Sequence, residues 1–221
     1  MIIKISQTAS NIKQSYEIEG ENFYYQGDTG SFCRLQDITL YNKENTIKGS
    51  YKFSKWFNYI PYRYLFGAYN VTRRFNIYKN ESIYGSVKYS RHGYFKSFYT
   101  VSLESGESFN CYDRAIGSFD YVSIYQGDNQ IALLETHLNV DNYKYTHKLY
   151  ILEDYNYLSD ALSFFVLYYA NYNFAKRFHM SIGSNYEKSW SISKYNDKYN
   201  SKWREQNFPQ ENFFGKTSLI D

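Results

Sequence analysis

Histidine, cysteine and acidic residues, which carry most enzyme chemistry, are few and widely spaced in this sequence. The four histidines are His92, His137, His147 and His179, and no two of them stand at the HxH or HxxxH spacing of a metal site. No GxSxG nucleophile turn, phosphate-binding loop or GxGxxG dinucleotide motif is present. The sequence therefore predicts no catalytic residue, no metal and no cofactor, and indicates a protein that is not an enzyme.

Three further patterns favour ordinary structure over chemistry. His137 and His147 fall on neighbouring expected strands, where they could meet across a hairpin or serve as structural histidines. The carboxylates Asp113, Asp120 and Glu135 are scattered, and their spacing pairs none of them. The two cysteines are too few for a disulfide scaffold, and both fall in expected strands as buried free thiols: Cys33 and Cys111.

The best functional candidate is a group of basic residues around the aromatic stretch 56–66, WFNYIPYRYLF. Arg73 shares the apolar face of its expected strand with Val71 and Phe75, where a cation needs a partner or a place at the barrel mouth. Cations beside exposed aromatic rings suit an anionic headgroup, because arginine binds phosphate in a bidentate manner. The alternative is a solvated strand face with one structural salt bridge. The predicted headgroup ligands are Lys52, Lys55, Arg63, Arg73 and Arg74.

The composition of the 221-residue chain predicts one strand-rich domain. It contains 28 Tyr and 17 Phe but only 2 Pro, and aromatic residues favour strands. The net charge of +3 is far from the bias of nucleic-acid binders, so we expect no nucleic-acid partner. The N-terminus shows no signal peptide and no apolar run reaches membrane-spanning length. We therefore expect a cytoplasmic protein, or one that is peripheral at the membrane.

Alternating apolar and polar residues predict eleven strands between residues 2 and 152. A polar turn at residues 42–45 joins two of them in a hairpin, and residues 26–30 are read as another turn. Ile83 is expected to point inward with Val87 and Tyr89. A phase change between Tyr121 and Val122 predicts a bulge. The expected strands are residues 2–6, 16–25, 32–41, 46–55, 69–78, 83–89, 94–103, 108–112, 119–125, 131–138 and 143–152.

Residues 159–174, SDALSFFVLYYANYNF, form the stretch around which these strands are organised. Only Ser163 interrupts the apolar run 161–169, and a helix that is apolar on all sides must be buried on all sides. Ser159 is the expected N-cap, and Asp160 lies in the first turn. The sequence therefore predicts a mainly β fold, a closed antiparallel barrel of about 11–12 strands around a central hydrophobic C-terminal helix.

The composition changes near residue 179, which divides the chain into an expected barrel domain at 1–178 and a polar, aromatic-containing tail at 179–221. If the tail is helical, Ile192, Tyr195, Tyr199 and Trp203 form one stripe flanked by lysines, and Pro209 would end the helix. An interfacial amphipathic helix, a helix or coil packed weakly on the barrel, and a disordered tail all remain open. The predicted contacts with a membrane or partner are Trp56, Trp190 and Trp203.

Residues 122–169, VSIYQGDNQIALLETHLNVDNYKYTHKLYILEDYNYLSDALSFFVLYY, resemble the LURP-one-related branch of the tubby-like superfamily. The hairpin DITLYNKENTIKGSYKF resembles the repeated units of the same family, and the resemblance covers about residues 1–178. It implies a closed barrel of roughly twelve strands threaded by a hydrophobic helix. Tubby proteins bind phosphoinositide headgroups through a basic patch, and the related scramblases are membrane-associated, so the resemblance implies lipid binding by analogy of fold.

The sequence thus leads to two functional hypotheses. The first is a non-enzymatic tubby-like module that recognises acidic phospholipid headgroups at a membrane surface. The alternative is a protein–protein interaction or scaffold domain of the same fold with no lipid ligand. A small-molecule barrel of the lipocalin kind is disfavoured, because the central helix would fill its cavity.

Overall fold

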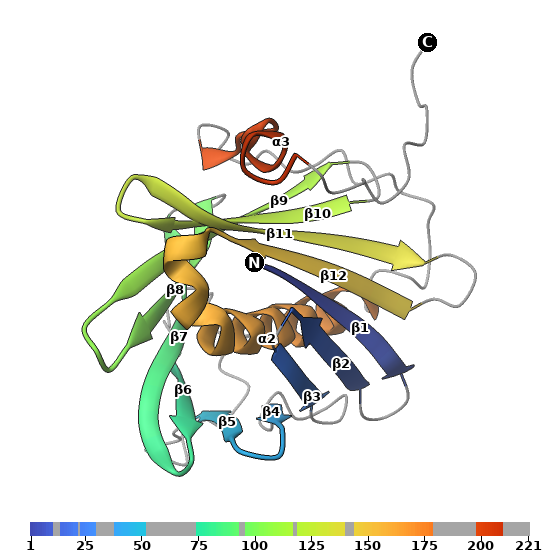
Figure 1. Cartoon of the computed structure of the whole chain (residues 1–221), viewed down its shortest axis with the longest axis vertical. Helices are drawn as coiled ribbons and strands as arrows, with labels where there is room; N and C mark the ends of the chain where they lie inside the picture. The colour runs from blue at the N-terminus through green and yellow to red at the C-terminus, as the bar shows by residue number, and fades with distance from the viewer. Residues whose placement is uncertain are drawn as a thin grey trace, which may run out of the picture.

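The computed structural model describes residues 1–10, 14–21, 23–29, 38–51, 74–92, 96–116, 119–139, 144–178 and 198–209. These residues form a closed antiparallel barrel in which each strand pairs with its neighbours in chain order, and β1 pairs with β12 (Figure 1). The twelve strands are β1 Ile2–Ser10, β2 Gln14–Gly20, β3 Phe23–Thr29, β4 Ile38–Tyr41, β5 Thr46–Tyr51, β6 Arg74–Lys79, β7 Ser82–His92, β8 Lys96–Leu103, β9 Ser108–Ile116, β10 Phe119–Gln126, β11 Asn129–Asn139 and β12 Lys144–Ile151.

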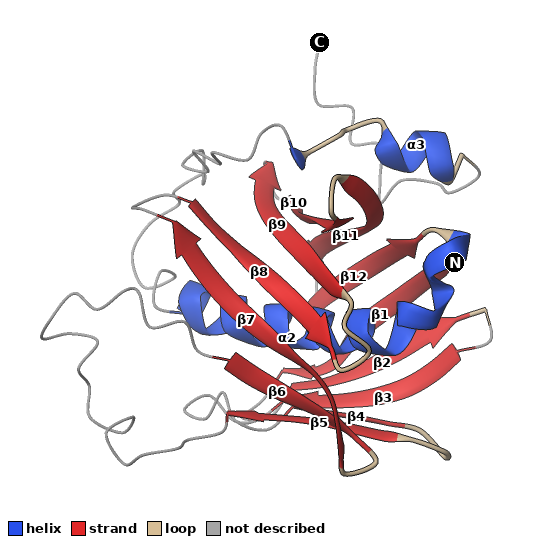
Figure 2. Ribbon diagram, turned by 90° about the vertical axis from the view of Figure 1, so that its left-hand side faces the viewer, coloured by secondary structure: helices blue, strands red, loops and turns tan. Residues whose placement is uncertain are grey.

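The barrel is filled by helix α2, Ser159–Phe178, which runs along its interior (Figure 2). All nine residues from Ala161 to Tyr169 are buried, as expected for a helix without a polar stripe. Ser159 is not the N-cap that we expected. A short 3₁₀ helix, η2 Glu153–Leu158, leads directly into α2, and Ser159 already has helical backbone angles. Asp160 in the first turn instead forms an ion pair with Lys79 on β6, at 2.5 Å.

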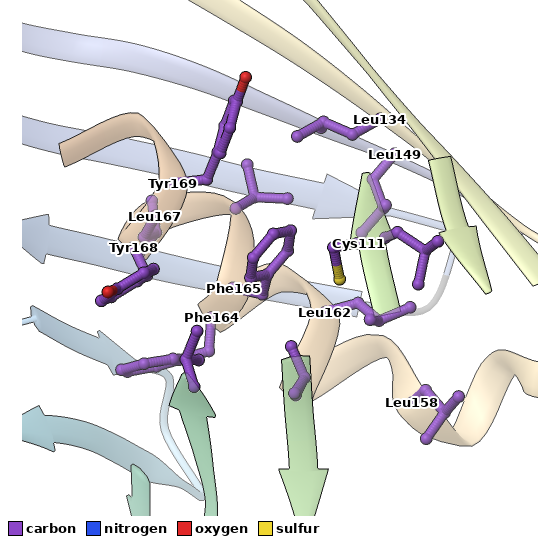
Figure 3. Packing of buried hydrophobic residues seen from close by; sticks show 14 of the residues in the cluster. Cys111, Leu134, Leu149, Leu158, Leu162, Phe164, Phe165, Leu167, Tyr168 and Tyr169 are labelled. Atoms are coloured by element: carbon purple, nitrogen blue, oxygen red, sulfur yellow. The ribbon is translucent and has the colours of Figure 1, made fainter. Parts of the chain in front are cut away.

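Aromatic rings connect α2 to the barrel wall (Figure 3). Tyr99 on β8 contacts Phe165, Tyr168 and Tyr169, with ring centroids 5.7, 6.1 and 5.8 Å apart. Such contacts add about 0.5–1.5 kcal/mol each to the stabilisation from apolar burial. The sulfur of Cys111 lies in the same core as a free, fully buried thiol, as the sequence predicted for this residue. The other expected buried thiol, Cys33, lies outside the described residues.

Two glycines bring the strands close to α2. A Cβ on Gly49 of β5 would lie 2.1 Å from a ring carbon of Phe75 and 2.3 Å from one of Phe164. A Cβ on Gly27 would lie 2.6 Å from Leu167. Gly27 explains why the turn expected at residues 26–30 is wrong: residues 26–29 lie in β3, where the glycine makes room for the helix.

Three other local predictions are also wrong. The strand expected at residues 16–25 is two strands, β2 and β3. Ile83 is 58% exposed, because an irregularity between Ile77 and Tyr78 shifts the register of β6 against β7.

The third concerns the bulge expected between Tyr121 and Val122. No irregularity separates these two residues in the pairing of β10 with β9. Ser123 and Tyr125 are buried on the opposite face of β10 to Val122, which explains the break in alternation.

Another described helix, α3 Trp203–Asn207, lies on the outside of the barrel (Figure 1), where Trp203 packs against Leu133 of β11 and Tyr150 of β12. Residues 199–202, which precede it, are not helical. Of the alternatives left open for the tail, residues 198–209 therefore follow the one in which a coil and a short helix pack on the barrel, with Tyr199 and Trp203 both facing it.

Candidate functional site

Five consecutive strands of the barrel contain no acidic residue. Strands β4 to β8 contain six Lys or Arg residues and no Asp or Glu. The other seven strands contain six Asp or Glu and four Lys or Arg. Among the residues of the strands, the excess of cations therefore lies on β4–β8.

Three of these cations occupy outward positions with described side chains. Lys48 on β5 and Arg74 on β6 are exposed, and Lys88 on β7 is partly exposed. Arg74 and Lys88 are directly opposite in the register of β6 and β7, which brings their Cβ atoms to about 5 Å. Lys48 is opposite Tyr78, four residues from Arg74 along β6, or about 13 Å. We call Lys48, Arg74 and Lys88 the cationic face.

The positive charges of the cationic face are not neutralised by carboxylates in the described part of the chain. Within the described part of the chain, no carboxylate forms an ion pair with any of its three residues. Like charges directly opposite one another across a strand pair are destabilising, so the Arg74–Lys88 pair costs stability in the isolated protein. An external anion placed between the two side chains would relieve that repulsion.

Of the five predicted headgroup ligands, the structure places Arg74 on this face. Lys52, Lys55, Arg63 and Arg73 lie outside the described residues. The strands that flank them are described: β5 ends at Tyr51 and β6 begins at Arg74, and Tyr51 pairs with Phe75. The end of β5 and the start of β6 therefore lie side by side, at the end of the barrel where Arg74 is found. Lys48 and Lys88 were missed, although the absence of carboxylates from their strands is visible in the sequence.

A hollow of about 740 Å³ lies beside Lys48 on the outside of β4–β6. Its lining includes Thr39, Thr46 and Tyr78 and also the acidic residue Glu81 of the β6–β7 turn. A second hollow, of about 460 Å³, lies where β1, β3 and η2 meet. Its lining includes Glu21 and Glu153, which makes it unsuited to an anion.

The interior of the barrel becomes polar towards the end at which α2 finishes. His147 on β12 points inward with Leu149 and is 1% exposed. Its Nδ1 lies 2.9 Å from the Thr136 hydroxyl oxygen, and its Nε2 has no hydrogen-bond partner. Burial lowers the pKa of His147 to about 4, so the imidazole is neutral. His137 is opposite Thr146 and faces outward, so the expected meeting of His137 with His147 does not occur.

Other inward-facing side chains near His147 also carry polar atoms that lack a hydrogen-bond partner. Gln7 on β1 accepts a hydrogen bond from the Tyr145 backbone N–H at 3.0 Å, but its Nε2 is unpartnered. The Thr29 hydroxyl and the Asn171 amide nitrogen are likewise buried without partners. Such groups are commonly satisfied by ordered water. Because all of these side chains are at least 93% buried, they offer no surface to a macromolecule.

The tail residue Trp203 is buried, at 7% exposure, against Leu133 and Tyr150. Membrane contact through this indole would require α3 to leave the barrel. The other two predicted contacts, Trp56 and Trp190, lie outside the described residues.

The described residues contain neither a membrane-spanning helix nor a cluster of metal-binding side chains. None of the helices there is both long and apolar enough to cross a membrane. No group of three or more His, Cys, Asp or Glu side chains in those ranges could hold a metal ion. Comparison with protein-family models, curated proteins and solved structures finds no match for this chain.

Proposed function

We propose that this protein is a non-enzymatic binding module that recognises acidic phospholipid headgroups at a membrane surface through its cationic face. The observation that carries the proposal is the exclusively positive charge of β4–β8, with Arg74 and Lys88 directly opposite one another. The resemblance of the sequence to the tubby-like superfamily supports it by analogy.

The energetics fit a peripheral interaction. A basic residue near an anionic membrane surface contributes about 1 kcal/mol, so Lys48, Arg74 and Lys88 together contribute about 3 kcal/mol. Arg74 also makes the interaction directional, because a guanidinium can donate two parallel hydrogen bonds to one phosphate group. Binding of this kind is weakened by salt, since the Debye length falls from about 30 Å at 0.01 M to about 8 Å at 0.15 M.

Vesicle sedimentation tests this function. The purified protein is mixed with phosphatidylcholine vesicles, with or without an added acidic phospholipid, at low and at physiological salt. We expect binding that requires the acidic lipid and weakens with salt. Binding to neither vesicle at either salt would refute the lipid ligand and favour a protein partner for the same face.

A matched pair of variants localises the binding. The double variant Arg74→Glu/Lys88→Glu reverses the cationic face. The control Lys4→Glu/Lys43→Glu changes the net charge equally at exposed positions on β1 and in the β4–β5 turn. Only the first variant should lose binding. Equal loss in both variants would indicate a response to net charge alone and would contradict a defined site.

A further inference from the structure

The outer face of β10–β12 is occupied by a segment from the far end of the chain, residues 198–209, which we call the docked segment. Figures 1 and 2 both show α3 outside the barrel, on the side of these strands. The centre of the face that it covers is formed by Tyr121, Tyr125, Leu133, Glu135 and Tyr150, which we call the docking face. At its margin, Arg114 lies over the Tyr199 ring and Asp128 pairs with Lys198.

A buried charge pair lies at the centre of this contact. Arg204 Nη1 is 3.6 Å from Glu135 Oε2, and the two side chains are 4% and 7% exposed. The Tyr150 hydroxyl donates a hydrogen bond to the same carboxylate oxygen at 3.2 Å. Burial raises the pKa of Glu135, and the nearby Arg204 is the first of the groups that oppose this rise. A buried charge without its partner is costly, so the pair makes docking selective for a segment with a cation at this position.

Aromatic contacts surround the charge pair. Trp203 packs against Leu133 and Tyr150, and Phe208 contacts Tyr150 with ring centroids 5.3 Å apart. At the other end of the segment, Tyr199 contacts Tyr121 at 5.4 Å. Large aromatic anchors around a desolvated arginine are the usual composition of a binding hot spot.

The backbone of the docked segment is independent of the barrel. Its backbone hydrogen bonds run within the segment, from Trp203 to Asn200, from Gln206 to Lys202 and from Phe208 to Arg204. The barrel closes through β1 and β12 without it. Undocking would therefore break side-chain contacts but no strand pairing, as when a peptide ligand leaves its site.

We propose that the docking face is a binding site for this segment as a separable ligand, and that it accepts the segment from a second copy of the chain as well as from its own. Residues 179–197 join the docked segment to α2 in the same chain. A segment that belongs to the same chain as its docking face meets that face at a higher effective concentration than a segment on another copy at micromolar protein. Docking within one chain therefore dominates at micromolar protein, and exchange between copies appears once it is blocked.

A charge-swap pair tests exchange in the full-length chain. Glu135→Arg places a cation against Arg204, and Arg204→Glu places an anion against Glu135, so each variant alone repels its own segment and that of an identical copy. In a mixture, the segment of each variant matches the docking face of the other. We expect each variant alone to remain monomeric and the mixture to form a complex of two chains in sedimentation equilibrium or native mass spectrometry.

The double variant Glu135→Arg/Arg204→Glu is the control, because the matched charges return to one chain and it should be monomeric. A mixture that stays monomeric while circular dichroism shows both barrels folded would overturn the proposal. If Glu135→Arg does not fold, a labelled peptide of residues 198–209 replaces it. The peptide should bind the Arg204→Glu protein at least tenfold more tightly than the wild type, whose docking face is occupied. Equal binding to both, or binding to neither, would also overturn the proposal.

Discussion

The buried imidazole of His147 should make the stability of this barrel fall as the pH is lowered. Burial holds the pKa of His147 near 4 in the folded protein, against about 6.5 for an exposed histidine. The unfolded chain therefore takes up a proton below pH 6.5 that the folded protein refuses until about pH 4. Stability from this group is complete above pH 6.5 and is lost as the pH falls.

The size of the loss follows from the two pKa values. Protonation of the unfolded chain alone costs about 2 kcal/mol of unfolding free energy between pH 7 and pH 5, and about 3 kcal/mol by pH 4. The rings nearest to His147 are Tyr16 and Tyr145. Burial raises the pKa of both tyrosines, so they stay neutral throughout this range and do not mask the effect.

The variant His147→Gln removes the titration and keeps a side chain that can hydrogen-bond to Thr136. Urea unfolding followed by tryptophan fluorescence, at pH 7 and pH 5, gives the unfolding free energy of each protein. We expect the wild type to lose about 2 kcal/mol more than the variant over this interval. Carboxylates elsewhere contribute equally to both proteins and cancel. The same pH dependence in wild type and variant would refute a neutral, buried His147.

Two further predictions concern the packing of the core. Gly49→Ala should lower the unfolding free energy by about 1–3 kcal/mol, because the added Cβ would overlap Phe75 and Phe164. Urea unfolding measures this change, and an unchanged value would mean that the strand can move away from α2. In a Cys33→Ser background, Cys111 should react with a thiol reagent only in denaturant. The thiol is fully buried, and burial raises its pKa. Rapid labelling of the native protein would contradict the closed core.

The elements that could be predicted are those whose pattern is local. The β4–β5 hairpin follows from alternation on both sides of a polar turn, and α2 follows from an apolar run too short for a membrane and too apolar for a surface. Ile83 was misplaced because its register depends on an irregularity in the pairing of β6 with β7. Residues 26–29 look like a turn in isolation, and only the close approach of Leu167 explains Gly27 within a strand.

Only part of the candidate site could be predicted, because the rest depends on which strands pair and how the tail packs. Arg74 was found because it stands beside other cations in the sequence, whereas Lys88 becomes its neighbour only through strand pairing. The pair Arg204–Glu135 joins positions 69 residues apart on the tail and the barrel, and neither residue alone carries a recognisable pattern. Contacts of this kind depend on tertiary structure, which spacing along the chain does not encode.

The most direct test of the proposed function is the affinity of Arg74→Glu/Lys88→Glu for acidic phospholipid vesicles at physiological salt, beside the wild type and the Lys4→Glu/Lys43→Glu control. Each reversal removes about 1 kcal/mol of attraction and adds comparable repulsion, so we expect the first variant to bind at least roughly a hundredfold more weakly. The control should stay closer to the wild type. Unchanged affinity in a folded Arg74→Glu/Lys88→Glu protein would contradict recognition through the cationic face.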